Sequence, residues 1–200
     1  MKREFNVTGI CVPERHYMVD ISEKIEQIYE LVESQKYFTI NRGRQYGKTT
    51  TIGMLKKRLP DDYVCAGISF QFSDEEMFAD AKGFSQELLS RIYYSLLINQ
   101  EEEAKLWLDD NVTSFQTLSR FITERCKGKK VVLIIDEADE AANNNIFITF
   151  LKMLRDKYLN RNAGKDYTFH SVILAGVYDV RNLKQKMVPS FVRAGPRPRH

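Results

Sequence analysis

The amino-acid sequence predicts an α/β fold: a three-layer domain in which a mostly parallel sheet is flanked by helices. Short apolar runs alternate with segments of helical periodicity along the chain, which is typical of alternating strands and helices. The run from Val131 to Ile135 is wholly apolar and mostly β-branched, as expected of a central parallel strand that is covered on both faces. The 200 residues suffice for one sizeable core and leave little room for a second.

The first half of the chain predicts two helices and two strands. Asp20 and Glu23 suggest a capping box for a helix with apolar positions three or four residues apart. A short strand follows at 37–41, and then a helix that Pro60 ends. The segment from Val64 to Phe72 is predicted to be the second strand.

Helices and strands also alternate in the second half. Helical spacing returns in Leu88, Leu89, Ile92 and Leu96, and again after Thr113, where Gln116 suggests another capping box. The apolar strand at 131–135 ends at Asp136 and is followed by a predicted helix. That helix presents its apolar residues, from Phe147 to Tyr158, to the core. A last strand is predicted at 171–175.

Composition excludes several classes of protein. The net charge is only +3, from 30 basic and 27 acidic residues, so nucleic acid is not implied as a partner by charge. No apolar run approaches the roughly 20 residues of a membrane span, and the N-terminus does not resemble a signal peptide. We therefore expect a cytoplasmic protein that does not contact a membrane.

Cysteine and histidine residues are few and scattered. They have no zinc-type spacing, so we expect no His or Cys metal centre and interpret the cysteines as buried or unreactive thiols. These residues are Cys11, Cys65, Cys126, His16, His170 and His200.

The loop after the first strand has the chemistry of a phosphate-binding site. A helix N-terminus offers unpaired N–H groups to phosphates, and Gly47 lets the backbone approach them closely. Lys48 would neutralise their charge, and the Thr49 hydroxyl would bind Mg²⁺. A general P-loop has glycine where this chain has Arg42. Alternatively, Gly47-Lys48-Thr49 is a chance tripeptide at the end of a turn.

A second motif follows the apolar strand at 131–135. A carboxylate at the C-terminal end of a parallel strand lies where open α/β sheets bind ligands. Asp136 would therefore hold Mg²⁺, and Glu137 would act as general base toward an attacking water. Alternatively, the two residues begin a helix, where the helix dipole also favours Asp139 and Glu140.

These motifs resemble the phosphate loop of the bacterial AAA-like ATPases. The segment 37–51, preceded by 16–20, is similar to their R-x-R-[RQ]-[FY]-G-K-[ST] pattern, in which Arg42 takes the usual first position. The resemblance extends from Phe5 to Lys186. It implies a protein that binds and hydrolyses ATP with Mg²⁺, and catalytic roles for Lys48 and Glu137. The implied nucleotide-binding residues are Arg42, Gly43, Arg44, Gln45, Tyr46, Gly47, Lys48, Thr49, Thr50 and Tyr17.

The resemblance also implies a P-loop core of the additional-strand type. The strand at 171–175 would lie between the strand that precedes the phosphate loop and the strand that ends at Asp136. Residues that sense the terminal phosphate would follow that inserted strand, with Tyr178, Asp179 and Arg181 as candidates. We expect residues 1–186 to form the ATPase core without its helical lid, and 187–200 to be a disordered tail or a remnant of cloning.

The sequence is also compatible with three other functions. Asp136 to Asp139 spells the DEAD sequence of RNA helicases, although a Ser-Ala-Thr-like motif and a second RecA-like domain are missing. A nucleotide-dependent switch with little turnover is the second alternative. The third is a module that binds DNA or protein through the basic residues Arg42, Arg44, Lys56, Lys57 and Arg58. The partner, whether a homo-oligomer, another protein or a further domain, is not identified by the sequence.

Overall fold

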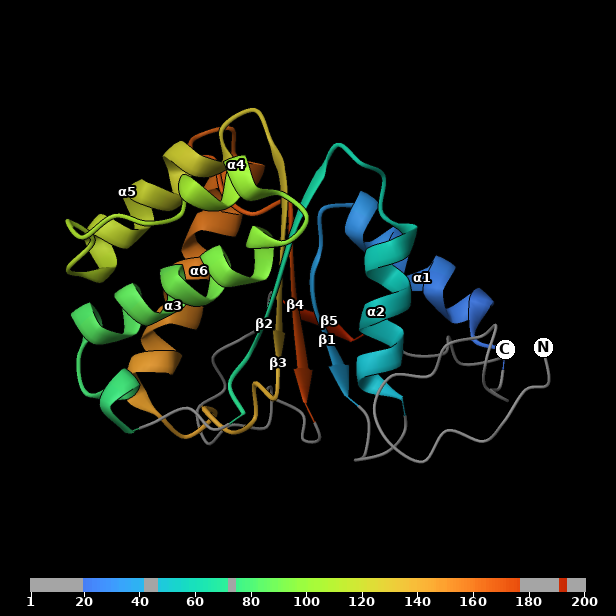
Figure 1. Ribbon diagram of the computed structural model, residues 1–200, viewed down its shortest axis with the longest axis horizontal. Helices are drawn as coiled ribbons and strands as arrows, with labels where there is room; N and C mark the ends of the chain where they lie inside the picture. The colour runs from blue at the N-terminus through green and yellow to red at the C-terminus, as the bar shows by residue number, and fades with distance from the viewer. Residues whose placement is uncertain (1–19, 42–46, 72–74, 177–190, 194–200) are drawn as a thin grey trace.

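The computed structural model describes residues 20–41, 47–71, 75–176 and 191–193 (Figure 1). Its strands are Tyr37–Asn41 (β1), Tyr63–Ser69 (β2), Lys130–Asp136 (β3), Ser171–Gly176 (β4) and Phe191–Arg193 (β5). Its α-helices are Ser22–Glu33 (α1), Lys48–Arg58 (α2), Ala81–Leu97 (α3), Glu101–Lys105 (α4), Phe115–Cys126 (α5) and Asn145–Asn162 (α6), and Glu75–Phe78 forms a 3₁₀ turn (η1). The predicted alternation of strands and helices is confirmed.

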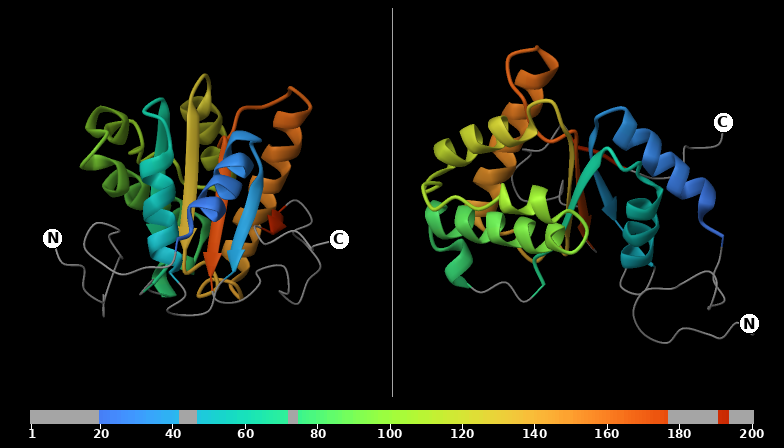
Figure 2. Two further views of the ribbon diagram at one scale, coloured as in Figure 1. Left: turned by 90° about the vertical axis from the view of Figure 1, so that its right-hand side faces the viewer. Right: turned by 45° about the horizontal axis from the view of Figure 1, so that its top comes forward.

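The strands form one sheet in the order β2-β3-β4-β1-β5, and every pairing in it is parallel. β4 lies between β1 and β3, which confirms the predicted position of the inserted strand (Figure 2). β5 pairs with β1, with Tyr37 opposite Phe191. The prediction of a disordered tail over 187–200 is therefore wrong for 191–193, because the open edge of β1 offers these residues backbone hydrogen bonds. The remainder of that tail lies outside the described residues.

The sheet separates two layers of helices, as a three-layer fold requires (Figure 1). α1 and α2 cover one face, where Val32 and Leu55 pack against Phe38 and Ile134. The other helices, α3 to α6, cover the opposite face over a larger core that includes Phe84, Trp107 and Phe150. Because all the strands are parallel, their carboxyl ends lie along a single edge of the sheet.

In two helices the N-cap residue lies one position after the predicted one. α1 has Ile21 as its N-cap residue and no side-chain cap, and Asp20 instead accepts a 2.9 Å hydrogen bond from Ser22 N. α5 has a capping box made by Ser114 and Thr117 rather than by Thr113 and Gln116. Ser114 is the residue whose extended backbone precedes the first helical turn, so its hydroxyl, and not that of Thr113, accepts the hydrogen bond from Thr117 N.

A buried ion pair ties α5 and α6 to the segment that leads into β4. Lys157, 3% exposed, donates hydrogen bonds to Ser119 O (2.9 Å), Thr123 Oγ1 (2.7 Å) and Asp166 Oδ2 (2.8 Å). All three hydrogen bonds of its ammonium group are thus used within the protein. We interpret this cluster as structural.

Two of the three cysteines lie in the described part of the chain. Burial raises the pKa of Cys65 to about 11 and also raises that of Cys126, so both thiols stay protonated at neutral pH, as expected of unreactive cysteines. Cys11 lies outside the described residues. Within the described ranges, no His, Cys, Asp and Glu side chains form a metal-binding cluster of three. None of the helices there is both long and apolar enough to span a bilayer.

Candidate functional site

Gly47 shapes the start of α2 at the carboxyl edge of the sheet. It is the N-cap residue and has a φ of +73°, a left-handed conformation that favours glycine. A Cβ atom added there would meet no atom of the described residues within 4 Å. The Gly47 carbonyl accepts hydrogen bonds from Thr51 N and Thr51 Oγ1, each at 2.8 Å, which hold the first turn in place. This start exposes N–H groups to an anionic ligand.

Lys48 lies between α2 and the end of β3. Its side chain is only 7% exposed, and its Nζ atom is 3.2 Å from Glu137 Oε1 and 3.7 Å from Asp136 Oδ1. The Nζ atom makes no hydrogen bond with any described group. A buried ammonium group held only by ion pairs retains the capacity to donate to a ligand. The fold therefore brings together the cation of the first motif and the two carboxylates of the second.

The next residues of α2 differ in exposure. Thr49 is exposed, whereas Thr50 and Thr51 are buried. A hydroxyl that is exposed at the first turn of α2 is free to join a metal ion, so Thr49 suits that role better than its two neighbours.

Asp136 and Glu137 are held by the turn at the end of β3. The Glu137 N–H donates a 2.9 Å hydrogen bond to Asp136 Oδ1, and Phe70 N donates a 3.0 Å bond to Asp136 O. Burial raises the pKa of Asp136 despite that N–H and the nearby Lys48. Glu137 has a φ of +51°, which is strained for a residue with a side chain and costs about 1–2 kcal/mol.

The left-handed backbone of Glu137 is incompatible with a helix that begins at Asp136 and Glu137, so that alternative is excluded. Residues 137–143 form turns, and α6 starts only at Asn145, where Asn144 Oδ1 accepts a 2.8 Å hydrogen bond from Ile146 N. Ala138 N donates to Ala175 O at 3.0 Å, which links the turn to the end of β4. The turn therefore directs its carboxylates to the carboxyl edge of the sheet.

Two polar residues at the same edge did not stand out in the sequence as site residues. Asn41 ends β1 directly before the phosphate loop, and it lies opposite Gly176 in the β1–β4 pairing. Asp139 packs on Gly176, because a Cβ atom at that glycine would lie 2.5 Å from Asp139 Oδ1. The signal available in the sequence was an amide at the last position of an otherwise mainly apolar strand.

Several predicted site residues lie outside the described residues. These are Arg42, Gly43, Arg44, Gln45 and Tyr46 of the phosphate loop, Tyr17, and the sensor candidates Tyr178, Asp179 and Arg181. Their roles stay predictions.

The basic residues on α2 are not all available to a nucleic acid. Arg58 donates to Glu26 at 2.7 and 3.1 Å, and its guanidinium group stacks 4.1 Å from the centre of the Tyr29 ring. The Lys56 side chain lies against Gly67, where an added Cβ atom would be 2.3 Å from its Nζ atom. This leaves Lys57 as the exposed lysine without such a described contact, which weakens the interpretation of α2 as a DNA-binding surface.

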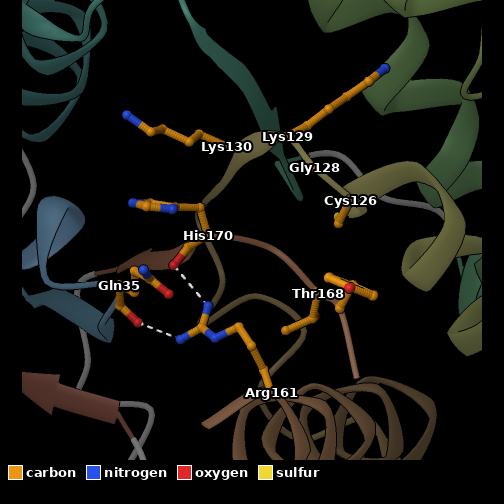
Figure 3. A pocket seen from close by; sticks show the side chains of 9 residues that line it. Gln35, Cys126, Gly128, Lys129, Lys130, Arg161, Thr168 and His170 are labelled. Carbon is orange, nitrogen blue, oxygen red and sulfur yellow. Dashed lines mark hydrogen bonds between the residues drawn. The ribbon is translucent and has the colours of Figure 1, made fainter. Parts of the chain in front are cut away.

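A cavity of about 270 Å³ lies at the opposite, amino end of the sheet (Figure 3). Its basic side chains have partners: Lys129 pairs with Glu103, Lys130 with Asp62 at 2.9 Å, and Arg161 donates to the carbonyls of Gln35, Phe169 and His170. Compensated cations attract an anion weakly. Of the cavity's basic side chains, only Arg161 has a buried atom without a hydrogen bond in the described part of the chain, its Nε, and the same guanidinium group makes three hydrogen bonds through its other nitrogen atoms.

Comparison with known proteins supports the fold. The chain is similar in structure to a solved Walker-type ATPase of Pyrococcus abyssi, with a TM-score of 0.58 and 12% sequence identity. The similarity covers 93% of the present chain. The chain spans only 54% of that structure. No known family and no curated protein matches the sequence. At this identity the likeness shows the fold alone, a parallel sheet flanked by helices as in that Walker-type ATPase.

Proposed function

We propose that the chain binds Mg·ATP at the carboxyl edge of the sheet and hydrolyses it. The observation that carries the proposal is that Lys48 lies beside Asp136 and Glu137 at the N-terminus of α2. A lysine poised for phosphate and a carboxylate pair poised for metal and water are the parts that phosphoryl transfer needs. The resemblance of the phosphate loop and the fold of the solved ATPase support the same function.

The residues present fit both ligands. The buried Lys48 Nζ atom lacks a hydrogen bond within the described residues and suits a phosphate oxygen, and no described residue fills the space beside Gly47. Thr49 and Asp136 supply a hydroxyl and a carboxylate, a sparse ligand set of the kind that Mg²⁺ completes with water and phosphate oxygens. The phosphate-loop residues 42–46 and Tyr17, which lie outside the described residues, would add further contacts.

Glu137 is the proposed general base. In hydrolysis it accepts a proton from the attacking water while the water oxygen bonds to the terminal phosphorus. The bond between that phosphorus and the bridging oxygen breaks, and its electron pair leaves with ADP. Lys48 must first move from Glu137 toward the phosphates, because a carboxylate paired at 3.2 Å with an ammonium group is a weaker base.

That ion pair also favours a second candidate function, a nucleotide-dependent switch with little turnover. As long as Lys48 is paired with Glu137, the carboxylate cannot act as general base and the site is inactive. A partner or a further domain would then control the release. The chain spans about half of the solved ATPase. The existence of such a partner and the process that it serves are therefore part of the proposal.

Titration calorimetry tests the proposal directly. The protein is titrated with Mg·ATP, Mg·ADP and Mg·GTP, and the ATP titration is repeated with EDTA. Lys48→Ala should weaken Mg·ATP binding by about 100-fold or more, because a charge-assisted contact to phosphate is lost. Lys57→Ala, an exposed lysine on the same helix, is the matched control and should bind as the wild type does.

Turnover separates the ATPase from the switch. Glu137→Gln should retain Mg·ATP binding while steady-state phosphate release falls by about 100-fold or more. If Glu137→Gln releases phosphate as fast as the wild type, Glu137 is not the base. If the wild type binds Mg·ATP and releases no phosphate above background, the switch is the better description.

A further inference from the structure

Asn41 is the least explained polar residue near the proposed nucleotide site. Its side-chain Nδ2 and Oδ1 atoms are both buried, and neither has a hydrogen-bond partner in the described part of the chain. A buried amide without partners costs free energy, so native proteins rarely retain one without a reason. Asn41 is also the last residue of β1, directly before the phosphate loop.

A second unpartnered atom belongs to Asp139, close to Asn41 on the same face of the sheet. The Tyr37 ring contacts Tyr158 of α6 at 4.8 Å, so alternation along β1 places Asn41 on the α6 face. Gly176 is the neighbour of Asn41 in β4, and the Asp139 side chain packs against Gly176 on this face. Asp139 Oδ1 is buried and, like the amide, has no hydrogen-bond partner among the described groups.

The unpartnered atoms define what a ligand there must offer. Asn41 Nδ2 is a donor and needs an acceptor, whereas Asn41 Oδ1 and Asp139 Oδ1 are acceptors and need donors. A terminal phosphate oxygen is an acceptor, and bound water molecules supply donors for the two oxygen atoms. Asn41 and Asp139 border the end of β4, between the strand that enters the phosphate loop and the strand that ends in the proposed catalytic carboxylates.

We propose that Asn41 and Asp139 form a subsite that recognises the terminal phosphate of ATP and its attacking water. Asn41 Nδ2 donates to a phosphate oxygen that ADP lacks, and Asp139 Oδ1 accepts a hydrogen bond from the water. Asn41 thereby distinguishes triphosphate from diphosphate. Asp139 is a positioning residue for the water that Glu137 deprotonates. This subsite rests on the proposed ATPase function and specifies which further residues read the nucleotide.

The test compares two substitutions in β1, at Asn41 and at Thr39, each of which removes a buried polar group that has no hydrogen-bond partner among the described residues. Thr39 is fully buried and its Oγ1 atom is also unpartnered within the described residues, but it lies two positions before Asn41, away from the sheet edge. Asn41→Leu and Thr39→Val are near-isosteric and are made in the Glu137→Gln background, so that ATP persists during calorimetry. Mg·ATP and Mg·ADP affinities are measured for each protein, and the stability without nucleotide is measured by urea unfolding.

We expect Asn41→Leu to reduce the ratio of ATP to ADP affinity by about tenfold or more, because one hydrogen bond to a charged oxygen is lost. Thr39→Val should leave this ratio unchanged. Neither substitution should lower the urea midpoint of the nucleotide-free protein, since neither removes a hydrogen bond. An unchanged ratio in Asn41→Leu overturns the inference, as does a lowered midpoint, which would reveal a structural partner of the amide.

Gly176→Ala tests Asp139 without altering any polar group. The added methyl group would lie 2.5 Å from Asp139 Oδ1 and 3.1 Å from its Cγ atom, so the carboxylate must move. In the wild-type background we expect phosphate release to fall about tenfold, with ADP affinity within about twofold of the wild type. Phosphate release at the wild-type rate overturns the role of Asp139.

If the wild type binds neither ATP nor ADP, the proposed function fails as a whole. If the wild type binds both nucleotides, and Asn41→Leu and Gly176→Ala have no effect on nucleotide discrimination or phosphate release, the subsite fails and the proposed function stands.

Discussion

Two aspartates at opposite ends of the sheet have opposite electrostatic environments. Asp166 precedes β4 at the amino end; burial alone would raise its pKa, but hydrogen bonds from Lys157 and Thr123 outweigh burial and lower it. Asp136 ends β3 at the carboxyl end, and there burial prevails and raises the pKa. One carboxylate is thus stabilised as an anion by the fold, whereas the fold destabilises the other.

This difference separates parts of the molecule that maintain the fold from parts that await a ligand. At the amino end, Lys157 uses all of its hydrogen-bond donors within the protein, one of them on the Asp166 carboxylate. The carboxyl end has a strained Glu137, and among the described residues Lys48 is held only by ion pairs and the amide of Asn41 has no hydrogen-bond partner. Groups left unsatisfied at a functional site reduce stability in exchange for binding. Substitutions at the two ends should therefore affect stability in opposite directions.

The largest stability effect is expected from Lys157→Met at the amino end. The substitution leaves the Asp166 carboxylate without its cation, and Ser119 O and Thr123 Oγ1 lose a donor. Loss of one partner from a buried ion pair destabilises a protein by about 3 kcal/mol or more. Urea unfolding measures the loss, and Lys105→Met, in an exposed ion pair on α4, should change the midpoint little. Equal effects of the two variants would contradict the structural role of Lys157.

Asp166→Asn should have a smaller effect that depends on pH. The pKa of Asp166 is below its ordinary value of 3.8 in the folded protein, so its ionised form stabilises the fold above that value. This contribution disappears as the pH falls through the folded pKa. We expect the variant to be less stable at pH 7 by roughly 1–2 kcal/mol and to lose less stability than the wild type on acidification. Urea midpoints between pH 7 and pH 3 measure both; parallel curves would contradict the assignment.

The fold was predictable because its signals are local. The apolar run at 131–135 and the helical spacing from Phe147 onward each identify one element without reference to the rest of the chain. The order of the strands came from the resemblance. The cap of α5 was placed one residue early, because Thr113 and Ser114 have the same capping chemistry and only the backbone conformation distinguishes them.

The candidate site was predictable only in part. Glycine, lysine and the carboxylate pair have a recognisable order in the sequence, and the fold brings Lys48, Asp136 and Glu137 together. Asn41 could not be identified, because an amide is ordinary at a strand end unless its hydrogen-bond partners are missing. Whether they are missing depends on neighbours such as Gly176 and Asp139, which are more than 90 residues away in the chain.

Asp136→Asn should have the smallest effect on stability and the opposite sign. Burial raises the pKa of Asp136, so the folded protein favours the protonated form and the ionised form costs stability as the pH rises through the folded pKa. Asparagine is neutral and can still accept the hydrogen bond from Glu137 N. At pH 7, with EDTA and without nucleotide, we expect Asp136→Asn to be more stable by roughly 0.5–1 kcal/mol.

The pH dependence makes this last prediction specific. The advantage of Asp136→Asn should shrink as the pH falls, because the wild-type carboxyl group then becomes neutral as well. Asp62→Asn is the control: Asp62 pairs with Lys130 at 2.9 Å, and its pKa is lowered chiefly by that hydrogen bond, so this variant should gain no stability at pH 7. If Asp136→Asn is less stable than the wild type at pH 7, Lys48 stabilises the Asp136 anion more than burial penalises it. The two ends of the sheet would then follow the same electrostatic rule, and the carboxyl end would have to be distinguished by Asn41 and the strained Glu137 alone.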